Sequence, residues 1–157
     1  MNVIGIILRK VEDTLHLLGC LCLVVIVVII NADILMRLIL GEPVQFQFEL
    51  TELYLMPALA TLSLSWVFRD GGHLALDFLP EHLPGLWGTA VGKLCLLLPS
   101  AFFFAVAYMS GKSALNAFMQ GQTHFGVVDW PLGWAYAAVP LGCGVLAVRL
   151  LYDALQR

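Results

Sequence analysis

Ionisable residues within or beside long apolar stretches are the first candidates for chemistry in this sequence. Asp33 and Arg37 are four residues apart and share one face if their segment is helical. Glu49 and Glu52, three apart, do the same at the start of the next apolar segment. A charge in such a segment is costly unless it is paired or faces water or protein. These residues therefore have two interpretations: a polar clamp between helices, or a site that binds an ion or substrate.

The histidines and cysteines do not form the pattern of a metal, haem or catalytic site. The four cysteines lie in apolar stretches and none belongs to a Cys-x-x-Cys pair, which favours small buried side chains. None of the four histidines is deep in a span, whereas bis-histidine haem needs facing imidazoles inside a bundle. No nucleophile stands beside a base. We predict a protein that is not an enzyme and holds no metal or cofactor.

The overall composition requires lipid as the solvent. Of the 157 residues, 61% are apolar and 12% are charged, against about 45–50% and about 25% in soluble domains. A spanning helix needs about 20 apolar residues, so the chain has room for four spans and short loops. No basic block or phosphate-binding glycine loop is present, which excludes nucleic acid as a partner. We predict an all-α integral membrane protein that forms one domain over 1–157, with spans at about 17–40, 49–68, 86–109 and 130–151.

Residues 3–15 have an amphipathic pattern. Ile4, Ile7, Leu8, Val11 and Leu15 share one helical face, and the other side carries Arg9, Lys10, Glu12 and Asp13. A short interfacial helix lying in the membrane surface has this pattern. A simple extension of the first span has it too, and both interpretations stay open.

The basic residues predict the orientation. Those expected on one side of the membrane are Arg9, Lys10, Arg69, Arg149 and Arg157, and those on the other are Arg37 and Lys112. Lysine and arginine are enriched in cytoplasmic loops. We therefore expect both termini in the cytoplasm, in the inner membrane of a bacterium or archaeon.

The short connection between the first two spans makes them antiparallel neighbours, so that Arg37 is expected to lie near Glu49 or Glu52. Asn31, two residues before Asp33, adds a group that can hydrogen-bond to another helix. All the charges lie near one interface, whereas transport sites usually lie near the midplane. We therefore favour the structural clamp over an ion site.

A second polar motif follows the second span. Arg69 precedes a Gly71-Gly72 turn, His73 comes next, and Asp77 stands four residues after the histidine. The apolar residues between them alternate with small or polar ones, which predicts a short interfacial segment. His73 and Asp77 are expected to form a local hydrogen bond or ion pair.

Taken together, these motifs resemble the small membrane subunit of tripartite ATP-independent periplasmic (TRAP) transporters, the DctQ-like family. The resemblance covers about the whole chain. It rests on an acidic residue and an arginine late in span one, a Glu-Leu entry to span two, an Arg-turn-His-Asp motif after it, and Pro-Leu-Gly in span four. The matching residues here are Asp33, Arg37, Glu49, Leu50, Arg69, His73, Asp77, Pro140, Leu141 and Gly142. There are two departures from the family: a tryptophan often precedes the glutamate, where this chain has Phe46 and Gln47, and Ser63 stands in place of a common glycine.

The resemblance implies a scaffold subunit of a sodium-driven transporter for organic acids. In such a system a periplasmic binding protein delivers the substrate to a large permease subunit, which moves it by an elevator-like motion. The small subunit packs against the large one and is static. Sodium is then expected to bind the large subunit and not this chain.

Two other functions remain as alternatives. One is a self-sufficient small transporter that acts as a homo-oligomer, with Glu49 or Glu52 as the coupling carboxylate. The other is a membrane anchor for a respiratory enzyme, which would bind haem or quinone.

Overall fold

The computed structural model of the chain describes residues 3–71, 86–126 and 128–156. Within these ranges, four helical segments are long and apolar enough to cross a membrane: Gly5–Leu40, Gln47–Arg69, Gly92–Met119 and Leu132–Gln156. A backbone in hydrocarbon must satisfy its hydrogen bonds within its own segment, and a helix does so. The predicted all-α membrane architecture is confirmed.

The first span is one uninterrupted helix, α1 (Val3–Leu40), of 38 residues. At 1.5 Å per residue it is about 57 Å long, well beyond the hydrocarbon core of about 30 Å. Residues 3–15 form its beginning and continue into the span without a break. The helix must therefore tilt or extend beyond the hydrocarbon.

The second span is irregular. It consists of α2 (Gln47–Leu50), a π-helical turn η1 (Thr51–Leu55), α3 (Met56–Leu62) and α4 (Leu64–Arg69). Pro57 has no N–H, so the carbonyl four residues earlier, inside η1, lacks its usual donor. The widened turn stands next to the proline that disturbs the helical hydrogen bonds. A second break, at Ser63, separates α3 from α4.

The last two spans are α6 (Leu86–Met119) and α7 (Leu132–Gln156), with Pro99 and Pro140 inside them. Strands β1 (Thr123–His124) and β2 (Trp130–Pro131) join them as a small antiparallel hairpin. Helix α6 continues past the predicted end of span three at 109, although polar residues follow that point. The hydroxyls of Ser110 and Ser113 donate to carbonyls of the preceding turn, so these serines are satisfied within the helix.

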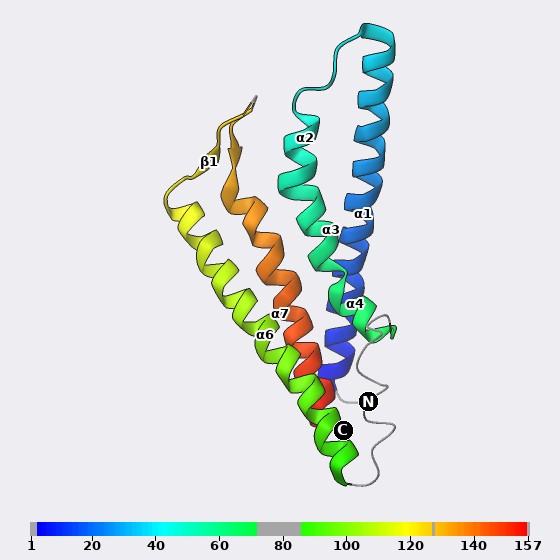
Figure 1. Ribbon diagram of the computed structural model, residues 1–157, viewed down its shortest axis with the longest axis vertical. Coiled ribbons are helices and arrows are strands. Elements are labelled where there is room, and N and C mark those ends of the chain that lie inside the picture. Colours follow the sequence, from blue (N-terminus) through cyan, green and yellow to red (C-terminus); the bar gives the residue numbers. More distant parts are fainter. Residues whose placement is uncertain (1–2, 72–85, 127, 157) are drawn as a thin grey trace.

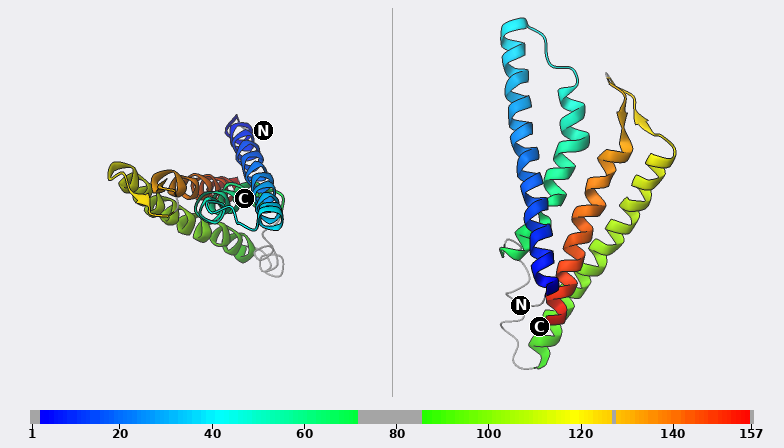
Figure 2. Two further views of the ribbon diagram at one scale, coloured as in Figure 1. Left: turned by 90° about the horizontal axis from the view of Figure 1, so that it is seen from above. Right: turned by 180° about the vertical axis from the view of Figure 1, so that it is seen from behind.

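The four spans form an open array. Helix α7 packs on α6 along one side and on α3 and α4 along the other, and α1 packs mainly on α3. Both termini lie at one end of the molecule, where the helices converge (Figure 1). At the opposite end, which carries the β-hairpin, α1 and α6 splay apart (Figure 2). Helices α1 and α6 are therefore the outer members of the array.

Two contacts hold the central helices together. A cluster of Leu96, Leu146, Leu150 and Ala154 is buried between α6 and α7, with Leu64, Phe68 and Phe103 packed against it. Nearer the beginning of α7, a Cβ atom on Gly142 would overlap the backbone carbonyl of Thr61 in α3. Glycine is therefore what lets α7 approach the second span so closely.

Candidate functional site

The predicted acidic and basic pair of the first span forms within α1. One oxygen of Asp33 accepts a hydrogen bond from Arg37 Nη2 at 2.9 Å. The other accepts the backbone N–H of Val44 at 2.7 Å, in the connection to α2. Asp33 is only 6% exposed, whereas the Arg37 side chain is 64% exposed. Asp33 therefore ties the end of α1 to the following loop, and charge-assisted bonds of this kind are the stronger ones.

Glu49 contacts the β-hairpin instead of the first helix. Its Oε2 accepts the indole N–H of Trp130 at 3.0 Å, and the backbone of Gly126 lies against the same carboxylate. Nearby, the Tyr54 hydroxyl donates to the carbonyl of Pro131 at 2.6 Å. These contacts fix the hairpin to the second span.

The remaining clamp residues do not reach across to neighbouring helices. Asn31 donates to the carbonyl of Val27 in its own helix at 2.7 Å, and Glu52 is exposed. In the described part of the chain, the ion pair of Arg37 is with Asp33, not with either glutamate. An acceptor one turn away on the same helix satisfies the arginine, so the expected contact with Glu49 or Glu52 does not form.

Among the described residues, the most deeply buried charge is Glu12, which the sequence analysis placed on the polar side of residues 3–15. Glu12 is 1% exposed and lies where α1, α4 and α7 converge. Its carboxylate accepts hydrogen bonds from Ser65 Oγ at 2.9 Å and Arg69 Nη1 at 3.0 Å. Arg149 Nη1 of α7 lies 3.5 Å from the same carboxylate.

Two further carboxylates complete this group, which we call the Glu12 cluster: Glu12, Asp13, Ser65, Arg69, Arg149 and Asp153. Asp13 pairs with Arg69, and Asp153 pairs with Arg149 at 3.3 Å. Each arginine thus has two carboxylate partners. An unpaired charge in this position would be costly, so the cluster fixes how the three helices meet.

Glu12 lies on a stripe of α1 that packs against the other helices. Buried or half-buried positions recur with alternating spacings of four and three residues: 8, 12, 15, 19, 22, 26, 29 and 33. This is the pattern of a helix packed along another helix. Glu12 and Asp33 both lie on it. Ile7 and Val11, which lie on the predicted apolar face of residues 3–15, are exposed, whereas Glu12 of the predicted polar side is buried against α4 and α7.

Ser63, which stands in place of a glycine common in the family, packs against a glycine of α1. A Cβ atom on Gly19 would lie 2.6 Å from Ser63 Oγ, so the missing side chain on α1 makes room for the serine. The hydroxyl lies 3.3 Å from His16 Nδ1. The His16 ring stacks on Trp66 with centroids 4.0 Å apart. His16 is therefore a packing residue between α1 and the second span.

The second predicted motif lies only partly in the described ranges. Arg69 belongs to the Glu12 cluster, whereas His73 and Asp77 lie outside the described residues. Across the ranges that are described, no group of three or more histidine, cysteine, aspartate or glutamate side chains is placed to hold a metal ion.

Four long apolar helices with paired charges between them define a multi-pass helical membrane protein. Residues 26–157 match the family of tripartite ATP-independent periplasmic transporters, DctQ component. The match covers most of the chain, and the chain belongs to this family. It is thus a small membrane subunit of a TRAP transporter, as the resemblance implied, and a transport component by class. No curated protein matches the chain significantly, and no solved structure does.

Proposed function

We propose that this chain is the scaffold subunit of a sodium-driven TRAP transporter for organic acids, and that it anchors a large elevator-type permease subunit in the membrane. The observation that carries the proposal is an open helical array whose outer helices expose long apolar faces, while the buried polar groups that the structure describes are bonded within the chain. An elevator motion needs a fixed body beside the moving one, and an array that presents a broad apolar side fits that need.

The apolar faces are extensive on both outer helices. In α1 the exposed large side chains include Leu17, Leu21, Val24 and Val28, and in α6 they include Leu94, Leu98, Phe102 and Phe104. Lipid and a partner helix are both apolar, so either can cover such a face. A subunit that packs beside a larger membrane protein needs at least one such apolar face.

The paired carboxylates support a structural role over an ion-coupling role. Asp33 holds a loop and Glu49 holds the β-hairpin, each through hydrogen bonds to its neighbours. A coupling carboxylate must bind and release its ion in each cycle, and one that fixes two elements together is poorly suited to do so. Sodium is then expected on the large subunit.

The basic residues support an orientation with both termini in the cytoplasm of the inner membrane. The β-hairpin end would then face the periplasm. There a substrate-binding protein would dock on the complex of the two membrane subunits.

Reconstitution tests the proposal directly. The full chain, the large permease subunit and both together are placed in liposomes with the binding protein, and uptake of an organic acid is measured with and without a sodium gradient. Uptake is expected only when the large subunit is present, and copurification of the two subunits is expected. Sodium-driven uptake by this chain alone would contradict the scaffold role and support the alternative with Glu49 or Glu52 as the coupling group.

A second experiment identifies which outer face is covered. Val28 on α1 and Leu98 on α6 are 61% and 66% exposed. A tryptophan is tolerated against lipid but clashes in a packed interface. We expect one of Val28→Trp and Leu98→Trp to reduce copurification of the large subunit and the other to leave it unchanged. No effect of either would contradict packing through these faces.

A further inference from the structure

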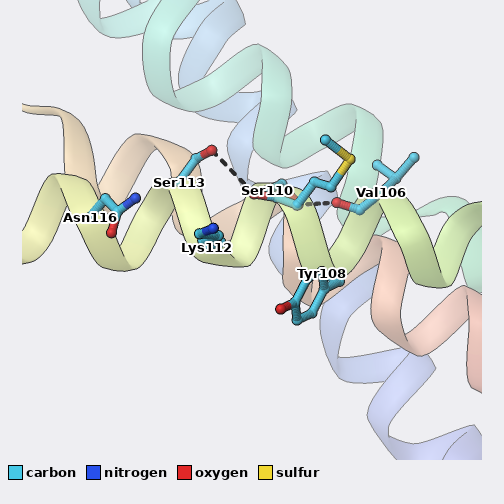
Figure 3. Close-up of a pocket in the computed structure, with 7 residues that line it drawn as sticks. Val106, Tyr108, Ser110, Lys112, Ser113 and Asn116 are labelled. Atoms are coloured by element: carbon cyan, nitrogen blue, oxygen red, sulfur yellow. Dashed lines mark hydrogen bonds between the residues drawn. The ribbon is translucent and has the colours of Figure 1, made fainter.

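A groove beside the outer part of α6 holds polar side chains that the proposed function does not use. Its volume is about 630 Å³, and its lining comprises Val106, Tyr108, Met109, Ser110, Lys112, Ser113 and Asn116 (Figure 3). The neighbouring groove continues from Ser110 and Ser113 to Tyr136 and Val139 of α7. Both lie toward the β-hairpin end of the two helices.

The polar residues of this groove are of two kinds. Ser110 and Ser113 donate their hydroxyl hydrogens to carbonyls of their own helix, as the dashed lines in Figure 3 show. Tyr108, Lys112 and Asn116 form no side-chain hydrogen bond or ion pair with any residue that the structure describes. A phenol, an ammonium and an amide thus remain free to donate, and an ammonium facing lipid is costly without a partner.

These three donors form one row. They are spaced by four residues, so they follow each other on neighbouring turns about 6 Å apart. Phe104, one turn earlier, is 66% exposed and continues the row toward the middle of the span. The sequence of groups is aromatic, phenol, ammonium and amide, from the membrane interior toward the end of the helix. A glycerophospholipid has the same order of polarity, from acyl chain through glycerol ester to phosphate.

Lys112 lies along α6 at a depth where the phosphate of a lipid headgroup is expected. Lys112 lies seven residues before the end of α6 at Met119, or about 10 Å along the helix. Trp134 and Tyr136, both exposed, stand at the start of the adjacent α7, and such aromatic residues are enriched at the level of the lipid headgroups. We propose that Tyr108, Lys112 and Asn116 form a binding site for an anionic glycerophospholipid, with its phosphate on Lys112 and its acyl chains along the apolar part of the groove.

Lys93 provides a matched control on the same helix. It is also exposed, but the residue four positions after it is Leu97, which has no donor, whereas Lys112 is followed at that spacing by Asn116. The full chain is purified in mild detergent, and native mass spectrometry measures the dissociation constant of the first bound phosphatidylglycerol, with phosphatidylcholine of the same acyl chains for comparison. Lys112→Gln is expected to weaken phosphatidylglycerol binding about tenfold, the loss of one charge-assisted hydrogen bond. Lys93→Gln is expected to leave binding unchanged, and Lys112→Arg to retain it.

Three outcomes would overturn the site. Equal effects of Lys112→Gln and Lys93→Gln would indicate nonspecific attraction of anionic lipid. Binding of glycerol 3-phosphate as tight as that of the lipid would indicate a soluble phosphate ligand. Absence of retained phosphatidylglycerol from this chain when it is copurified with the large subunit would indicate that protein covers the groove. Unchanged thermal unfolding of Lys112→Gln without added lipid checks that the exposed substitution preserves the fold.

Discussion

Glu12→Gln tests whether the Glu12 cluster holds the three helices together. The substitution keeps the size of the side chain and an acceptor for Ser65, but it removes the negative charge between Arg69 and Arg149. Breaking a buried ion pair costs about 3–5 kcal/mol. The cost here is reduced because Arg69 retains Asp13 and Arg149 retains Asp153. We expect a loss of about 2–3 kcal/mol of unfolding free energy, a smaller value than for a fully isolated pair.

The neighbouring carboxylate provides the control. Asp13 pairs with the same arginine, but its side chain is 58% exposed, and exposed pairs contribute about 0–1 kcal/mol. Unfolding is followed in detergent as the loss of helical circular dichroism on heating. Glu12→Gln is expected to lower the midpoint by roughly 5–10 °C, from the relation for domains of this size, and Asp13→Asn by much less. Equal shifts for the two variants would refute the argument that burial sets the cost.

A double substitution examines the coupling inside the cluster. Arg149→Gln alone is expected to destabilise the protein, because it leaves Glu12 with less positive charge around it. Residues in one ion-pair network are not additive, so Glu12→Gln with Arg149→Gln should cost less than the sum of the two single changes. Strict additivity would show that the 3.5 Å contact between them contributes no interaction energy.

Four further substitutions test three of the contacts described above. Gly142→Ala should lower the unfolding midpoint, because its Cβ would meet a backbone carbonyl of the second span. Gly144→Ala, whose nearest neighbour would be 4.0 Å away, should raise the midpoint, because alanine favours the helix over glycine by about 1 kcal/mol of unfolding free energy. Destabilisation by both would contradict this. Glu49→Gln should preserve the sodium dependence of the reconstituted complex, since glutamine still accepts the Trp130 N–H, and an altered sodium response would place this residue in the mechanism. Arg37→Ala should weaken copurification of the large subunit by leaving a buried carboxylate with one partner fewer, and undiminished copurification and uptake would count against a role of the pair in assembly.

The features that could be predicted from the sequence depend on interactions within a single segment. The long apolar runs require spans, and in lipid a span of this length must be helical. The Asp33–Arg37 pair depends only on spacing along one helix, so it follows from the sequence in any helical fold. The serines at 110 and 113 bond to their own helix for the same reason. The predicted third span nevertheless ended at 109, just before these serines, and hydropathy does not count hydrogen bonds within a segment.

The partners of Glu12 and Glu49 depended on tertiary structure. Ser65 and Trp130 are 53 and 81 residues away from them, and nothing local in the sequence brings them together. In a soluble protein the apolar face of a helix shows which side is packed. In a membrane, lipid is as apolar as a protein interior, so Ile7 and Val11 are apolar and exposed while Glu12 is charged and buried. The sequence determined that four helices cross the membrane; their rotation about their own axes, and hence the contacts between them, was decided by packing.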